Sequence, residues 1–85
     1  MTRVTLLTKP DCAFCDQAKQ TLDRLGREFD LSVEVVPLDS EAGRALSARS
    51  GMAFPPGVLL DGQPFSHGRL SERKLRRVLQ THQSR

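Results

Sequence analysis

Two cysteines, Cys12 and Cys15, are the residues of this sequence best suited to chemistry, and only two residues separate them. Cysteines spaced in this way at the start of a helix lie on one face, close enough to form a disulfide with little backbone movement. Such a bond closes a very short loop, so it constrains the unfolded chain much less than a long-range bridge would. The pair is therefore predicted to be a reversible dithiol rather than a structural crosslink.

The position of each cysteine along the helix predicts a different role for it. Cys12 lies where free backbone N–H groups and the positive end of the helix dipole favour a thiolate, so it is the expected nucleophile. Cys15, one turn further in, is suited to attack the mixed disulfide that Cys12 forms with a substrate. Lys9 adds a positive charge that stabilises the thiolate or receives a substrate carboxylate, whereas Asp11 and Asp16 act in the opposite direction.

A zinc site is the main alternative for a Cys-x-x-Cys pair. A closed structural site needs four ligands, and without a second cysteine pair His67 and His82 would have to complete it. Those histidines are fifteen residues apart, which does not match common zinc spacings. We therefore expect no metal. Two unrelated structural cysteines are a further alternative, which the spacing and the flanking pattern disfavour.

The rest of the sequence predicts the elements that position this pair. Short apolar or β-branched runs indicate four strands, at residues 4–7, 33–36, 58–60 and 63–65. Apolar residues at helical spacing indicate three helices, over residues 13–25, over about 42–49 and from 72 onward. The order β-α-β-α-β-β-α predicts an α/β fold with one four-stranded mixed sheet. A right-handed crossover then places Cys12 at the C-terminal edge of the first strand.

Caps and turns are predicted at the ends of these elements. The expected N-caps are Asp11, the Asp39-Ser40 pair and Ser71, and Leu70 with Leu75 occupies the positions of a hydrophobic staple. Gly26 and Gly51 are expected to end the first two helices, and Gly43 to weaken the second. Asp61-Gly62 suits a type I′ hairpin turn.

Length and composition indicate one domain, residues 1–85, with a flexible polar tail from residue 80. Two cysteines without a disulfide framework fit a reducing compartment, and the N-terminal apolar run is too short for a signal peptide or a membrane span. A cytoplasmic monomer is therefore expected. The formal net charge is +3, and the basic residues of the last helix are predicted to form a solvated face; they are Arg73, Lys74, Arg76 and Arg77. Because no aromatic residues interleave with them, no nucleic-acid partner is expected.

The segment from Thr8 to Cys15 resembles the active-site segment of glutaredoxins and of the small redoxins that reduce ribonucleotide reductase. The resemblance covers nearly the whole chain, from residue 4 to about 79, and implies the thioredoxin fold. Lys9 and Phe14 occupy positions at which a lysine and an aromatic residue are typical of that family. Phe14 is either a substrate contact or a core residue. Three other phenylalanines are expected in the core: Phe29, Phe54 and Phe65.

The resemblance also implies a cis-proline opposite the dithiol, and the spacing from the Asp61-Gly62 turn selects Pro56. In this family the preceding residue offers its backbone N–H and C=O to the thiol substrate, but Pro55 has no N–H. Gly68 and Ser71 match a glutathione site, whereas Arg69 replaces its second glycine. Arg69 either blocks the tripeptide or offers its guanidinium to a carboxylate.

Together these features predict a thiol–disulfide oxidoreductase in electron transport, which reduces protein or mixed disulfides without a bound cofactor. The resemblance implies a thioredoxin-reductase-like protein or glutathione as electron donor, and glutathione is the one candidate co-substrate. Two alternatives remain open. One is a glutathione-dependent glutaredoxin, or a glutathione- or metal-binding module, that uses Cys12; the other is a redox-inert interaction domain.

Overall fold

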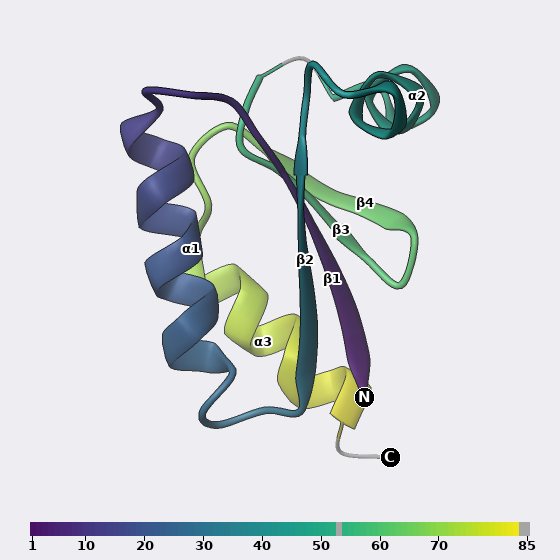
Figure 1. Ribbon diagram of the computed structural model, residues 1–85. Coiled ribbons are helices and arrows are strands. Elements are labelled where there is room, and N and C mark those ends of the chain that lie inside the picture. The colour runs from purple at the N-terminus through teal and green to yellow at the C-terminus, as the bar shows by residue number, and fades with distance from the viewer. Residues whose placement is uncertain (53, 84–85) are drawn as a thin grey trace.

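The computed structural model describes residues 1–52 and 54–83, which form four strands and three helices (Figure 1). The elements are β1 (Thr2–Thr8), α1 (Ala13–Leu25), β2 (Leu31–Pro37), α2 (Glu41–Ser50), β3 (Gly57–Leu60), β4 (Gln63–His67) and α3 (Glu72–Gln83). The predicted order is confirmed. Most of the strands extend beyond their apolar runs, because backbone pairing continues into the flanking residues.

The strands form one mixed sheet in the order β2-β1-β3-β4. Strand β1 pairs in parallel with β2 and antiparallel with β3, which in turn pairs antiparallel with β4. Helices α1 and α3 cover one face of this sheet, and α2 lies on the other near the end of β1 (Figure 1). The four-stranded mixed sheet and its three helices match the predicted fold class.

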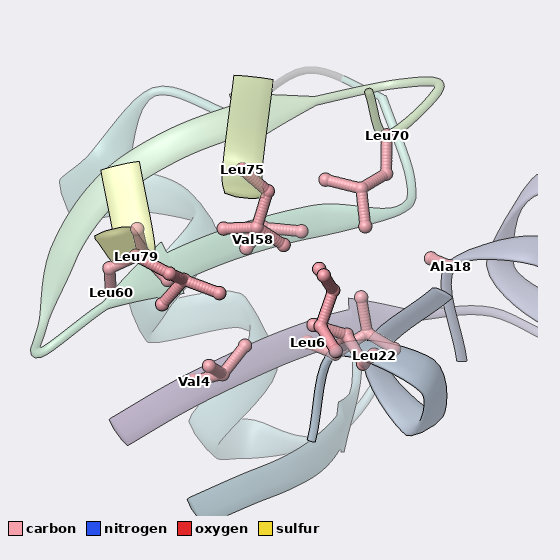
Figure 2. Packing of buried hydrophobic residues seen from close by; sticks show 10 residues of the cluster. Val4, Leu6, Ala18, Leu22, Val58, Leu60, Leu70, Leu75 and Leu79 are labelled. Carbon is pink, nitrogen blue, oxygen red and sulfur yellow. The ribbon is translucent and has the colours of Figure 1, made fainter. Parts of the chain in front are cut away.

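Two clusters of buried side chains hold the helices to the sheet. On the α1/α3 face, Val4 and Leu6 of β1 pack with side chains of β3, α1 and α3 (Figure 2). On the α2 face, Leu7 packs with Val36, Met52 and Leu59. Because successive side chains of a strand point to opposite faces, β1 contributes to both clusters. The strand that leads to Cys12 is therefore buried from both sides.

Helix α3 begins as the sequence predicts. The Ser71 hydroxyl accepts a hydrogen bond from the Lys74 N–H at 3.3 Å, and Leu70 and Leu75 are buried in the same cluster. The helix continues to Gln83, so residues 80–83 of the segment expected to be a tail are helical, and residues 84–85 lie outside the described part. Among residues 1–52 and 54–83, the helices lack the combination of length and apolar character that a membrane span needs.

The other caps agree with the sequence except at α1. Ser40 caps α2, Gly51 ends that helix with a φ of 69°, and Asp61 and Gly62 have the positive φ values of a type I′ turn. The prediction that Asp11 caps α1 is wrong, because the N-cap is Cys12. The chain turns at Asp11, whose φ is 55°, and Cys12 is the last extended residue before the helix.

Gly43 has a steric role that its low helix propensity does not reveal. It is buried in the first turn of α2, and a Cβ atom on it would overlap the Pro37 carbonyl oxygen and lie 2.9 Å from Leu38 Cα. These neighbours are backbone atoms, which cannot move aside as a side chain could. The glycine therefore lets α2 pack closely against the chain that leaves β2.

Gly43→Ala is expected to destabilise the protein by about 1–3 kcal/mol, because the added methyl group overpacks this contact. Helix propensity alone predicts the opposite sign, a gain of about 1 kcal/mol. Urea unfolding followed by circular dichroism measures the difference. A variant more stable than wild type would show that α2 does not pack closely here.

Two ion pairs connect α3 to α1 and to the turn after it, and a third lies within α3. Glu72 accepts a 2.6 Å hydrogen bond from Arg24 and a 3.2 Å hydrogen bond from Arg76, which also pairs with Glu28. Arg76 therefore belongs to this network rather than to a purely solvated face. The hydrogen bond from Arg24, followed by that from Arg76, lowers the pKa of the Glu72 carboxyl, and the Glu28 carboxylate raises the pKa of Arg76.

Because its pKa is lower in the folded state, Glu72 stabilises the fold above its ordinary value of 4.5, and this contribution disappears as the pH falls through the lowered pKa. We expect Glu72→Gln to be less stable than wild type at pH 7 and closer to it below pH 4. Glu34→Gln, a change at an exposed position of β2, is the matched control. Urea midpoints at both pH values test this expectation. It would be contradicted if the difference in urea midpoint between wild type and Glu72→Gln were the same at pH 7 and below pH 4.

Candidate active site

The two cysteines lie where β1 passes into α1. Strand β1 ends at Thr8, the chain turns through Asp11, and Cys12 occupies the N-cap of α1. Cys12 and Cys15 form a disulfide, with their Cα atoms 5.1 Å apart. The spacing predicted this closure, and the structure contains it.

The two sulfur atoms have different surroundings. Cys12 is half-buried, whereas Cys15 is 1 % exposed and lies beneath the start of the helix. The N–H of Cys15 donates a hydrogen bond to Cys12 Sγ at 3.1 Å. Cys12 Sγ therefore occupies the place of an N-cap oxygen, at the positive end of the helix dipole.

A proline segment lies opposite the dithiol. The Pro55-Pro56 peptide bond is cis, at the bond that the resemblance implies. Pro56 is fully buried, Pro55 is half-buried and Phe54 is exposed at the surface. In Figure 1 the chain entering β3 and the loop leaving β4 lie at the same edge of the sheet as the start of α1.

An open groove of about 470 Å³ runs between these segments. Its lining residues are Lys9, Cys12, Ala13 and Phe14 on the α1 side, and Phe54, Pro55, Gly68 and Arg69 on the other. Six predicted site residues thus meet at one place. Cys15 and Pro56 are buried and do not line the groove, and Ser71 lies in a neighbouring one.

Comparison with known families agrees with this geometry. A family model described as "Glutaredoxin-like domain (DUF836)" matches residues 3–80. The chain belongs to the glutaredoxin-like domain family. No curated protein matches the sequence. The family, the fold and the disulfide-forming cysteine pair together support a redox role for this glutaredoxin-like domain.

Solved structures with the same fold include a thioredoxin and two thioredoxin-like proteins. A mutant thioredoxin from Halobacterium salinarum has a TM-score of 0.74 at 19 % identity, over 94 % of this chain and 73 % of its own. A thioredoxin-like protein from Clostridium perfringens has a TM-score of 0.77 at 14 % identity, over 95 % and 70 %. Another crystallised thioredoxin-like protein has a TM-score of 0.72 at 24 % identity, over 89 % of this chain and 99 % of its own. At these identities the likeness shows the fold alone.

Two aromatic side chains are exposed beside Cys12. Phe14 is 51 % exposed, which makes it a surface of the groove rather than a core residue. The prediction that Phe54 belongs to the core is wrong, because the residue is 66 % exposed. Phe29 and Phe65 pack against the main cluster as predicted. No local pattern marks Phe54 as exposed, because the side chain that its ring stacks on belongs to the end of β4.

The Phe54 ring is held by the end of β4. It stacks on the His67 ring with centroids 6.0 Å apart and planes inclined by 13°. The Gly68 N–H donates a hydrogen bond to the Phe54 carbonyl at 3.0 Å, and Gly68 has a φ of 81°. His67 therefore supports the groove wall. The described residues contain no group of three or more side chains that could hold a metal ion.

In the reduced glutaredoxin-like domain we expect Cys12 to be alkylated at least about tenfold faster than Cys15, because Cys12 is accessible and lies at a helix N-terminus. A short pulse of iodoacetamide followed by mass spectrometry of the digested protein measures both rates. The urea-unfolded protein, in which the two thiols should react alike, is the control. Equal labelling in the folded state would show that the burial of Cys15 does not protect it.

Proposed function

We propose that this glutaredoxin-like domain is a thiol–disulfide oxidoreductase that reduces disulfides of proteins or peptides. The observation that carries the proposal is the asymmetry of its disulfide. One sulfur, that of Cys12, faces an open groove at a helix N-terminus, and the other, that of Cys15, is buried directly behind it. This is the arrangement that a nucleophilic thiol and a resolving thiol require.

In the first step the Cys12 thiolate attacks one sulfur of the substrate disulfide. The substrate S–S bond breaks, a bond between Cys12 and the substrate forms, and the other substrate sulfur leaves as a thiolate that is protonated by water. The Cys15 N–H, which donates to Cys12 Sγ at 3.1 Å, is placed to stabilise the attacking thiolate. Lys9 lines the same groove and adds a positive charge beside it.

In the second step Cys15 resolves the mixed disulfide. Its thiol releases a proton, and the resulting thiolate attacks Cys12 Sγ. The Cys12–Cys15 bond forms, the bond between Cys12 and the substrate breaks, and the second substrate sulfur leaves as a thiolate that is protonated by water. The substrate has gained two electrons and two protons, which the protein dithiol has lost. We propose that a thioredoxin-reductase-like protein or glutathione returns them, in a reducing compartment such as the cytoplasm.

The walls of the groove favour a peptide over glutathione. Phe14 and Phe54 offer exposed apolar surface on the two sides of Cys12, which suits the side chains that flank a cysteine in a protein. Pro55 offers a backbone carbonyl but no N–H, so it provides half of the backbone pairing that a thiol tripeptide would use. Arg69 lines the groove directly after Gly68 and fills space that a second glycine would leave open.

Substitution of each cysteine tests the two roles separately. Cys12→Ser should reduce insulin with dithiothreitol no faster than dithiothreitol alone, because no nucleophile remains. Cys15→Ser should turn over at least about tenfold more slowly and accumulate a mixed disulfide on Cys12 that mass spectrometry detects. Ala48→Ser, on the exposed face of α2, is the control for the effect of introducing a serine away from the dithiol. Wild-type activity in Cys12→Ser would exclude the proposed mechanism, and full activity in Cys15→Ser would exclude its resolving step.

A further inference from the structure

A second groove adjoins the one that contains Cys12. It has a volume of about 380 Å³ and lies between α1 and the start of α3, where Gln17, Thr21, Arg24 and Arg73 contribute to its walls. Arg69 lines both grooves. A chain bound at Cys12 can therefore continue past Arg69 into the second groove.

The two grooves follow one stripe of α1. Phe14 lines the first groove, and Gln17, Thr21 and Arg24 line the second. Residues three and four apart share a helix face, so these side chains form a continuous row that starts beside Cys12. The row faces the N-terminal end of α3, whose dipole is positive there. An extended peptide laid along it would meet Arg69 and then Arg73.

The charges along this path are mostly positive. Lys9, Arg69 and Arg73 have no carboxylate partner among the described residues, and Arg24 shares Glu72 with Arg76. Glu72 is the one acidic side chain that lines either groove, and two arginines already engage it. The path to Cys12 is therefore a cationic surface.

Three aspartates lie near the site but outside both grooves. Asp11 immediately precedes Cys12, and Asp16 and Asp23 project from α1, but none of them lines either groove. At about 100° per residue, Asp16 and Asp23 project roughly 120° away from the row that begins at Phe14. Lys19 projects on the same side of α1 as these two aspartates, so this side of the helix carries charges of both signs outside the two grooves.

On this basis we propose that the domain selects disulfide substrates whose chain carries acidic residues on one side of the reactive cysteine. Arg69 and Arg73 bind the carboxylates while Phe14 and Phe54 contact the residues next to the disulfide. The inference rests on the proposed function, since it identifies the substrate class of the same site. Charge complementarity of this kind acts on the rate of encounter and on the choice of partner more than on final affinity.

The test uses peptides with a single cysteine activated as the neutral 2-pyridyl disulfide, with glutamate, glutamine or lysine residues on the N-terminal or the C-terminal side of it. The reduced protein attacks the peptide sulfur and releases 2-thiopyridone, which is followed by stopped-flow absorbance. Each rate constant is divided by that of the same peptide with dithiothreitol, an uncharged thiol, to remove differences in intrinsic reactivity. On one side of the cysteine, the glutamate peptide should then react about tenfold faster than the glutamine peptide at low ionic strength. This preference should largely disappear in about 0.5 M salt.

Paired substitutions assign the effect to these grooves. Arg69→Gln with Arg73→Gln should lower the preference for glutamate over glutamine to about twofold or less, because both unpaired arginines of the path are removed. Arg44→Gln with Arg49→Gln removes the same charge from α2, on the other face of the sheet, and should keep the wild-type preference.

The outcomes separate this inference from the proposed function. If the glutamine peptide reacts well but the glutamate peptide reacts no faster, or if both paired variants lose the preference equally, the acidic-substrate inference fails alone. If no peptide reacts faster with the protein than with dithiothreitol, the proposed function fails and the inference fails with it. A mixed disulfide of the glutamine peptide with glutathione is a separate substrate, and mass spectrometry follows its reduction. If loss of Arg69 and Arg73 slows the reaction of this substrate alone, the path serves glutathione and the inference is overturned.

Discussion

The geometry of the active site depends on the burial of β1 from both sides. Val4 and Leu6 pack under α1 and α3, Leu7 packs toward α2, and each of the three is at most 1 % exposed. A central strand held in this way has its last residue at a fixed position at the edge of the sheet. The packing of β1 in the core therefore positions the turn through Asp11 and the first turn of α1, which contain Cys12 and Cys15.

The chemical difference between the two cysteines follows from the same packing. Helix α1 turns Cys15 toward the sheet, whereas Cys12 precedes the helix and remains at its open end. A single tetrad therefore contains one accessible sulfur beside free N–H groups and one sulfur shielded by the core. The helix supplies both conditions. Its N-terminus provides the N–H donors, and its first turn directs the Cys15 side chain toward the core.

The wall opposite the cysteines is assembled from segments that are distant in sequence. Phe54 stacks on His67, and the hydrogen bond from Gly68 to the Phe54 carbonyl fixes the loop after β4 against the segment before β3. Arg69 follows directly and lies between the two grooves. The same short loop thus supports the apolar wall and provides the charge that faces the α1 row. The loop after β4 therefore determines both the position of the apolar wall and the positive charge of the site.

Residue patterns along the chain were enough to predict the order of the elements, the dithiol and most of the caps, because these are local properties. Strand runs, helical spacing, the Ser71 cap and the Asp61-Gly62 turn each depend on residues close together in the chain, and the structure contains all of them. The family resemblance added the cis bond at Pro56, which no local pattern specifies.

Features that depend on contacts between distant segments became visible in the folded protein alone. The exposure of Phe54, the role of His67 behind it and the need for glycine at position 43 all result from neighbours far away in sequence or in another element. The same is true of Arg76, whose partners Glu28 and Glu72 include one from beyond its own helix. Whether an apolar ring is buried, or a charge is paired, depends on which surfaces the fold brings together, and spacing along a chain does not contain that information.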